Sequence, residues 1–160
     1  MKAAVWLALA IAACGPGIKG GPTINNHSES ELQPVSSPVV SADILSRDVL
    51  ANEVGVKHIL IGWKDLQDGR VDERASKRTK SDAETLVKQV LEQLKGGADF
   101  DAMMKQYSED PGSAMSGRVY KVSPQAELVS EFKQLGMRLR PNEIGVVQSD
   151  YGFHIIKRVE

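Results

Sequence analysis

The side chains best suited to catalysis or metal binding are few in this 160-residue chain, which has three histidines and one cysteine. His58 and His154 lie within apolar runs, His27 lies in a polar segment, and Cys14 follows an apolar stretch. One cysteine cannot form an internal disulfide, and so few Cys and His residues exclude a Cys/His zinc cage. A single histidine in a strand is more often a hydrogen-bonded core residue than a catalytic group.

Asp110 is the acidic residue with the most distinctive position. It stands directly before Pro111 and Gly112. Asp is common at such turns because its side chain can bond the backbone two residues on. On its own, therefore, Asp110 indicates a turn as readily as a functional carboxylate.

The overall charge is nearly balanced, with 20 Lys and Arg against 21 Asp and Glu and a net charge of -1. A nucleic-acid binder needs a basic surface that displaces counterions from phosphates, so this class is excluded. No segment reaches the roughly 18 to 20 consecutive apolar residues of a membrane-spanning helix.

The N-terminus has the pattern of a secretory signal, because Lys2 is followed by an apolar run from Ala3 to Ala13 without an acidic residue. The run ends in Ile11-Ala12-Ala13-Cys14, which resembles the lipobox of bacterial lipoproteins. That resemblance implies a signal peptide over residues 1–13 and lipidation of Cys14. The alternative is an ordinary export signal in which Cys14 is incidental.

Residues 14–53 are expected to form a disordered tether, because the stretch from Gly15 to Pro38 is rich in Gly, Pro, Ser and Asn. A short helix is predicted within residues 41–53, with Ser41 as its N-cap. Gly15 does not resemble a retention signal for the inner membrane, which favours the outer membrane.

The folded domain is predicted over residues 54–160. Residues 54–61 are apolar at both odd and even positions, as in a strand buried on both faces. The charged stretch 64–80 is expected to be an exposed loop. A helix follows from Ser81, which with Glu84 has the pattern of a capping box, and it ends at Gly96 and Gly97.

A second helix is predicted after Asp99 and is broken at Asp110. A short strand over residues 117–122, a helix from Pro124 and a terminal hairpin of residues 144–148 and 153–159 complete the order. Helices grouped between strands, with a hairpin at the end, favour an α+β sheet covered by helices over a doubly wound parallel sheet.

Four short motifs are spread over this domain: Val56-Lys57-His58-Ile59-Leu60-Ile61, Gly96-Gly97-Ala98-Asp99-Phe100, Tyr107-Ser108-Glu109-Asp110 and Tyr151-Gly152-Phe153-His154-Ile155-Ile156. In this order and at this spacing they resemble the parvulin-type peptidyl-prolyl cis/trans isomerases, over essentially the whole predicted domain. The resemblance implies an α+β, FKBP-like fold in which a four-stranded antiparallel sheet is covered by helices.

The resemblance also implies an active cleft where the two histidine-bearing strands meet the Asp110 turn. By position, His58 and His154 would be paired core histidines, Asp110 the acidic catalytic residue and Ser149 a hydroxyl beside the histidines. The proline pocket would be walled by Val119, Leu128 and Phe132. Without the resemblance, Leu128 and Phe132 at i and i+4 on a helix would be ordinary core residues.

We therefore predict a prolyl isomerase, lipid-anchored in the bacterial cell envelope and facing the periplasm, that needs no cofactor or metal. Its expected partners are unfolded or partly folded exported polypeptides with X-Pro bonds, and the membrane through the anchor. We expect a monomer that does not bind nucleic acid. The alternative is a peptide-binding chaperone module of the same fold with weak or no catalysis. A third hypothesis is a structural lipoprotein whose domain only docks to a partner.

Overall fold

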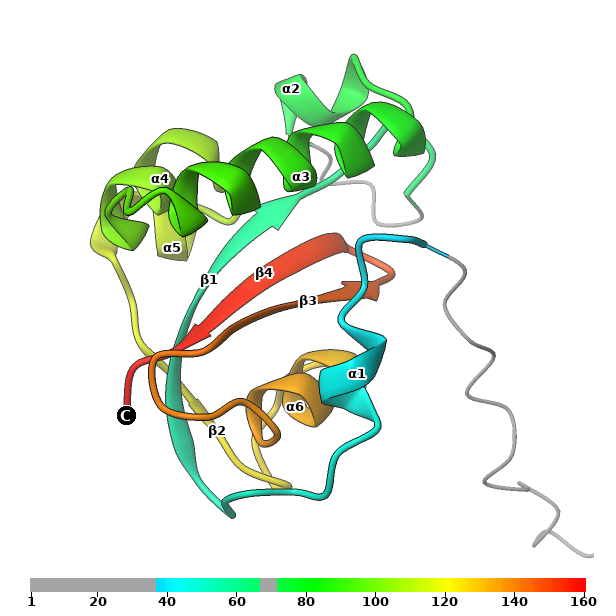
Figure 1. Ribbon diagram of the computed structural model, residues 1–160. Helices are drawn as coiled ribbons and strands as arrows, with labels where there is room; N and C mark the ends of the chain where they lie inside the picture. The colour runs from blue at the N-terminus through cyan, green and yellow to red at the C-terminus, as the bar shows by residue number, and fades with distance from the viewer. Residues whose placement is uncertain (1–36, 67–71) are drawn as a thin grey trace, which may run out of the picture. The chain divides into compact units, whose positions relative to one another are not determined.

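The computed structural model describes residues 37–66 and 72–160 (Figure 1). In chain order the elements of these residues are α1 (Ala42–Leu45), β1 (Val54–Ile61), α2 (Glu73–Ser76), α3 (Lys80–Lys95), α4 (Phe100–Tyr107), α5 (Pro111–Ser116), β2 (Tyr120–Val122), α6 (Ser130–Gly136), β3 (Ile144–Ser149) and β4 (Gly152–Arg158).

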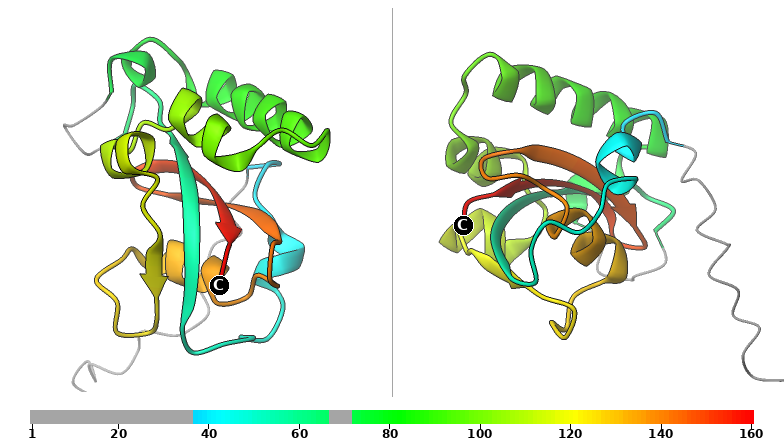
Figure 2. Two further views of the ribbon diagram at one scale, coloured as in Figure 1. Left: turned by 90° about the vertical axis from the view of Figure 1, so that its left-hand side faces the viewer. Right: turned by 60° about the horizontal axis from the view of Figure 1, so that its bottom comes forward.

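The strands in the described part of the chain form one four-stranded antiparallel sheet in the order β2-β1-β4-β3. Helices α3 and α4 lie on one face of this sheet, and α6 and α1 lie on the other (Figures 1 and 2). The α+β prediction of an antiparallel sheet covered by helices is confirmed.

Each face of the sheet packs into its own apolar cluster, because successive side chains of a strand point to opposite faces. Ile59 and Ile61 of β1 pack with α3 and α4. Val54 and Val56 of the same strand pack with α6. His58 has the same parity as Val56, so it points toward α6, and this face is the one that carries the candidate site.

The start of α3 differs from the predicted capping box at Ser81 and Glu84. Thr79 is the N-cap, and its hydroxyl accepts the backbone N–H of Asp82 at 3.2 Å while the Asp82 carboxylate accepts the backbone N–H of Thr79 at 2.8 Å. Glu84 is used elsewhere, because its Oε1 accepts the hydroxyl of Ser37 at 2.8 Å. The sequence contains two overlapping capping-box patterns, Thr79 with Asp82 and Ser81 with Glu84, and the first of them forms the cap.

The packed chain begins earlier than Val54, the predicted start of the domain. Val39 and Ile44 are buried, one in each apolar cluster. The backbone N–H of Ser41 donates to the carbonyl of Val146, and the hydroxyl of Ser41 accepts the N–H of Val146, both at 2.9 Å. Residues 37–53 are therefore joined to the sheet by contacts with residues about a hundred positions away, which local composition does not reveal.

The helix predicted within residues 41–53 is only one turn long, Ala42–Leu45. The Ser41 side chain makes no capping bond to it, because that hydroxyl is bonded to Val146. The predicted signal peptide, Cys14 and most of the predicted tether lie outside the described residues. In the described part of the chain, no helix is both long enough and apolar enough to cross a membrane.

Three further local predictions need correction. The stretch expected to be an exposed loop contains α2, and Ala75 of this helix is buried. The helix expected to be broken at Asp110 ends earlier, at Tyr107, and Asp110 instead caps the start of α5. The helix expected from Pro124 begins at Ser130, and residues 124–128 form turns.

The β3–β4 hairpin gives a direct test of the fold. Gly152 has a φ of +134°, and a Cβ there would lie 2.5 Å from the carbonyl oxygen of Ile61. Gly97 also has a positive φ, +95°, but a Cβ there would have no neighbour within 4 Å. We expect Gly97→Ala to cost about 1–2 kcal/mol of unfolding free energy from backbone strain. We expect Gly152→Ala to cost about 2 kcal/mol more, because the backbone of β1 must move.

Urea unfolding of the two variants measures this difference. Equal losses would show that the close approach of the hairpin to β1 has no energetic effect.

Candidate active site

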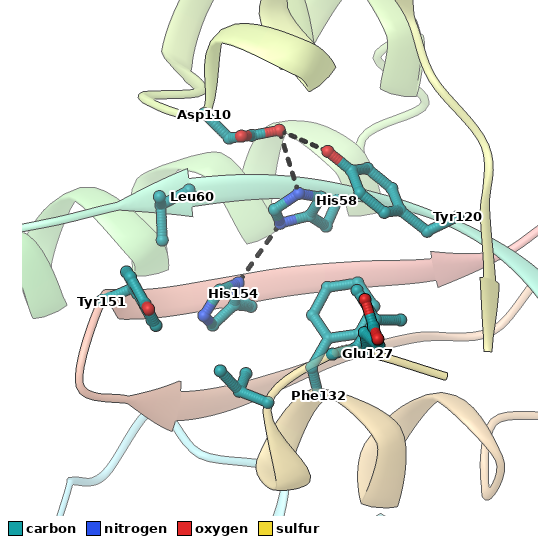
Figure 3. Close-up of a pocket in the computed structure, with 10 residues that line it drawn as sticks. His58, Leu60, Asp110, Tyr120, Glu127, Phe132, Tyr151 and His154 are labelled. Carbon is teal, nitrogen blue, oxygen red and sulfur yellow. Dashed lines mark hydrogen bonds and ion pairs between the residues drawn. The ribbon is translucent and has the colours of Figure 1, made fainter. Parts of the chain in front are cut away.

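Two histidines from neighbouring strands touch on the α6 face of the sheet. His58 lies opposite Ile156 in the β1–β4 ladder, and Leu60 lies opposite His154, so the two histidines are diagonal neighbours. Their Nδ1 atoms are 3.2 Å apart, and the rings stack with centroids 5.3 Å apart and an interplanar angle of 26° (Figure 3). Both side chains are buried.

Ser149 extends this polar line from β3. Its hydroxyl oxygen lies 2.7 Å from Nε2 of His154 and accepts the backbone N–H of Tyr151 at 3.1 Å. The residue is opposite Gly152 in the β3–β4 ladder and is buried. Ser149 therefore supports His154 from behind and does not line the pocket.

Asp110 closes the other end of the line as the N-cap of α5. Its Oδ2 atom accepts the backbone N–H of Ser113 at 2.8 Å, the hydroxyl of Ser113 at 2.7 Å and the hydroxyl of Tyr120 at 2.8 Å. The same oxygen lies 3.3 Å from Nε2 of His58. These contacts gather around one oxygen, and none of the contacts made by the described residues uses Oδ1.

The surroundings of Asp110 favour its charged form. The contact with His58 is the largest influence that lowers the pKa of Asp110, and the bonds from Ser113 and Tyr120 lower it further, while partial burial acts in the opposite direction. The carboxylate is therefore ionised at neutral pH, and a negative charge faces the histidine pair.

This charge fixes the order of protons along the line when each ring carries one proton. A carboxylate only accepts, so His58 must carry its proton on Nε2 and leave Nδ1 as an acceptor. His154 then donates from Nδ1 to His58, and its Nε2 accepts the proton of Ser149. All four imidazole nitrogens of the line are bonded in this order, as buried polar groups require.

Burial also changes the titration of two other residues of the site, His154 and Tyr120. Burial lowers the pKa of His154 to about 3, and the nearby His58 adds to the effect. Burial, followed by the hydrogen bond to Asp110, raises the pKa of Tyr120. His154 is thus a neutral ring at neutral pH, suited to accepting the Ser149 proton and not to carrying charge.

A pocket opens beside this polar line (Figure 3). Its volume is about 220 Å³, and it is lined by His58, Leu60, Asp110, Tyr120, Glu127, Leu128, Val129, Phe132, Tyr151 and His154. Pockets for drug-sized ligands take roughly 300–1,000 Å³, so this one suits a single small apolar ring. Phe132 forms its inner wall, edge-on to both histidines at centroid distances of 5.1 and 5.5 Å.

The structure brings together most of the residues expected at the site. His58, Asp110, His154, Leu128 and Phe132 line the pocket, and Ser149 lies directly behind His154. It does not bring in Val119, which is exposed and precedes β2. Cys14, the predicted lipidation site, is outside the described residues.

Tyr120 takes the place that we expected Val119 to fill. Its ring lies edge-on to His58 with centroids 5.0 Å apart, and its hydroxyl bonds Asp110. The alternation of a strand could have revealed this, because Tyr120 shares a face with Val122, which packs with α6. Sequence reasoning also missed four further lining residues, Leu60, Glu127, Val129 and Tyr151.

No metal site accompanies the pocket in the described part of the chain, where no three His, Cys, Asp or Glu side chains are grouped so as to hold an ion. The arrangement can grip an apolar ring and place a carboxylate beside it.

An antiparallel sheet whose inner strands hold stacked histidines, beside a carboxylate and a small apolar pocket, is the architecture of the parvulin class of peptidyl-prolyl isomerases. Residues 43–160 match the model of the PPIC-type PPIase domain. The chain belongs to this family.

Named relatives agree with this assignment. The chain is 32% identical over 123 residues to the foldase protein PrsA of Geobacillus kaustophilus, a match covering 74% of this chain and 43% of the relative. It is 31% identical to the chaperone SurA of Pseudomonas putida over 70% of this chain and 24% of the relative.

Among solved structures, the peptidylprolyl isomerase PrsA of Bacillus cereus superimposes with a TM-score of 0.52 at 30% identity. That match covers 76% of this chain and 39% of the solved chain. The chain spans less than half the length of these relatives.

The lowered pKa of His154 predicts a specific pH dependence of stability. As pH falls below about 6.5, the histidine of the unfolded chain takes up a proton while the buried ring does not, so stability is lost between about pH 6.5 and pH 3. Unfolding by urea should take up nearly one more proton per molecule near pH 5 in the native sequence than in His154→Gln. If the free energy of unfolding depends on pH in the same way in the two proteins, His154 is not buried as a neutral ring.

Proposed function

We propose that this chain catalyses cis/trans isomerisation of X-Pro bonds in unfolded or partly folded exported polypeptides. The observation that carries the proposal is the small apolar pocket directly beside an ionised carboxylate. A prolyl ring fits this volume, and an X-Pro bond emerging from the pocket would pass Asp110.

The chemistry needs no bond to be made or broken. Rotation about the X-Pro amide must overcome a resonance barrier of ~18–20 kcal/mol, and the enzyme must bind the twisted amide more tightly than either planar form. Leu128, Val129 and Phe132 hold the ring in a water-poor site, where the less polar twisted amide is favoured.

Asp110 supplies the electrostatic part of this mechanism. Because Oδ2 is occupied by Ser113 and Tyr120, the charge left to face the substrate carbonyl is on the side of Oδ1. A negative charge near that carbonyl disfavours the charge-separated resonance form of the amide and weakens its C–N double bond. Attack by a carboxylate on an unactivated amide would be a poor route, so we assign no covalent role.

The histidines and Ser149 act as positioning residues. The ring of His58 separates Asp110 from His154, and the line of bonds ending at Ser149 holds both rings in one orientation. Phe132 packs against both rings. The pocket wall and the carboxylate therefore keep a fixed separation.

A protease-coupled assay on an Ala-Xaa-Pro peptide series tests the proposal. We expect Asp110→Ala to lower kcat/KM by about a hundredfold, the lower end of the loss found when one electrostatic group is removed from an active site. Leu128→Ala should raise KM more than it lowers kcat, because it removes ring binding. Glu131→Ala, on α6 outside the pocket lining, is the control and should keep native rates.

Native activity in both Asp110→Ala and Leu128→Ala would refute the site. A native chain that binds prolyl peptides without accelerating their isomerisation would instead support the peptide-binding chaperone module.

We further propose that the chain works in the bacterial cell envelope, held there by lipid on Cys14. The support is the apolar N-terminal run ending in Ile11-Ala12-Ala13-Cys14 and the foldase and chaperone names of its relatives. Multiple acyl chains give stable anchoring where one chain would be marginal.

Mass spectrometry of the protein from bacterial membranes tests the anchor. We expect a mature N-terminus at Cys14 carrying acyl groups, and we expect Cys14→Ser to release the protein from the membrane fraction. An unmodified Cys14 in the membrane-bound protein would rule out lipidation.

A further inference from the structure

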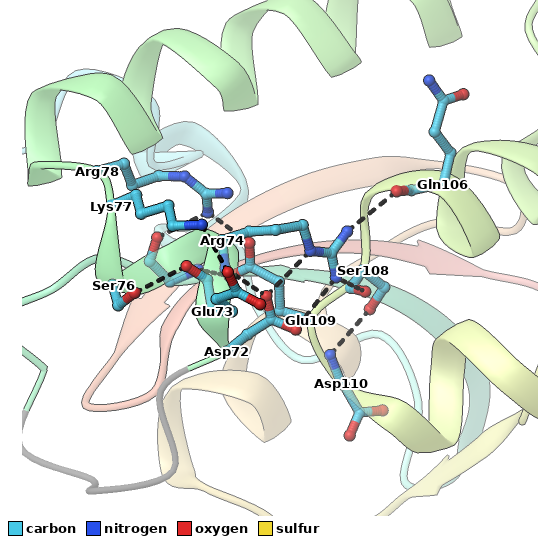
Figure 4. A network of polar contacts seen from close by, with 11 residues as sticks. Asp72, Glu73, Arg74, Ser76, Lys77, Arg78, Gln106, Ser108, Glu109 and Asp110 are labelled. Carbon is cyan, nitrogen blue, oxygen red and sulfur yellow. Dashed lines mark hydrogen bonds and ion pairs between the residues drawn. The ribbon is translucent and has the colours of Figure 1, made fainter.

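Figure 4 shows the three-residue segment between α4 and α5, Ser108-Glu109-Asp110, next to Arg74 and Arg78. Hydrogen bonds join this segment to the end of β1. The backbone N–H of Glu109 donates to the carbonyl of Leu60 at 2.9 Å. The hydroxyl of Ser108 accepts the N–H of Leu60 at 3.1 Å and that of Asp110 at 3.3 Å. The backbone that carries Asp110 is thus attached to the strand that carries His58.

The side chain of Glu109 strengthens this attachment. Its Oε2 accepts the backbone N–H of Gly62 at 2.7 Å, and its Oε1 forms an ion pair with Arg78. Arg78 also donates to the carbonyl of Gly62 at 2.9 Å. The Glu109 side chain is only 3% exposed and that of Arg78 is 14% exposed, so both charges are largely removed from water.

A buried ion pair is weak support for stability, because the cost of removing two charges from water offsets most of their attraction. Its value lies in directed geometry, since the guanidinium and carboxylate fix their partners in few arrangements. Here Glu109, which directly precedes Asp110 in the chain, is held by Gly62 after β1 and by Arg78 after α2. Arg78 is bonded to Gly62 as well. The neighbouring Arg74 adds bonds to the carbonyls of Gln106 and Ser108, but it is more exposed.

We propose that the Arg78–Glu109 pair is a positioning device that holds Asp110 at its working distance from His58 and the pocket. The inference rests on the proposed isomerase function. Ser113 and Tyr120 orient the carboxylate, but they lie on α5 and β2. The Arg78–Glu109 pair ties the backbone of the same residue to β1. Loosening it would let Asp110 move with α5 away from His58, while the apolar wall from Leu128 to Phe132 stays in place.

The test compares Arg78→Met and Glu109→Gln with Lys77→Met in the full chain. Lys77 is the matched control, because it adjoins Arg78 and carries the same charge, but its ion pair within the described residues is with exposed Glu73 at the surface. We expect Arg78→Met to lower kcat by about tenfold or more, since misplacement of a catalytic group by about 1 Å can cost a hundredfold. KM should change less than about twofold, because ring binding is untouched. Lys77→Met should retain native values.

Titration of Tyr120, followed by NMR, is the second readout. The hydrogen bond to Asp110 helps raise the pKa of Tyr120, so displacement of the carboxylate should bring that pKa down in Arg78→Met and Glu109→Gln but not in Lys77→Met. A loss of stability alone would not change this titration in the folded protein.

Each outcome decides the proposal. A folded Arg78→Met with native kcat and an unshifted Tyr120 titration overturns it, as does a rise in KM at constant kcat. Should Arg78→Met fail to fold, Glu109→Gln decides, because its amide still accepts the N–H of Gly62. A native chain without isomerase activity defeats the proposed function, whereas the Tyr120 titration still tests whether the pair positions Asp110.

Discussion

Antiparallel pairing of β1 with β4 puts two imidazole rings from residues 96 positions apart into direct contact on one face of the sheet. Buried imidazoles need partners for both nitrogens, and each ring can offer only one proton when neutral. The carboxylate of Asp110 at one end determines which nitrogen of each neutral ring carries the proton, because a carboxylate can only accept hydrogen bonds. Ser149 at the far end meets the same requirement by bonding the outer nitrogen of His154, and Tyr120 donates a hydrogen bond to the carboxylate.

The two faces of the sheet divide the tasks of stability and chemistry. The face covered by α3 and α4 is an apolar cluster without polar side chains of the site. The α6 face combines apolar packing with the histidine line, so the same Phe132 that fills the core also forms the pocket wall. The rigid antiparallel ladder between these layers sets the distance between the apolar wall and the charge.

The sequence was sufficient to predict the helices and strands that have strong local patterns, and the site residues that lie within the four family motifs. The doubly apolar strand β1, the amphipathic α3 and the terminal hairpin were all expected, and so was the meeting of His58, His154 and Asp110. Predictions failed where two local patterns overlapped, as with Thr79 and Ser81 at the start of α3. They also failed where long-range contacts decide, as with Val39 and Ile44. The pocket is lined by Tyr120 and not by Val119, so the prediction was wrong by one residue. In a strand, neighbouring residues point to opposite faces, so an error of one position selects the wrong face.

Under the proposed function, the contact between Ser41 and β3 affects how the sheet meets unstructured polypeptides. A strand at the margin of a sheet offers unpaired amides to any extended polypeptide, and such pairing leads to aggregation. In β3 the outward amide groups of Val146 are already occupied by Ser41. The opposite margin is β2, which has only three residues. Under the proposed function, this contact and the shortness of β2 disfavour the addition of an extended polypeptide to the sheet as a further strand, and we expect such a polypeptide to bind at the pocket beside Asp110.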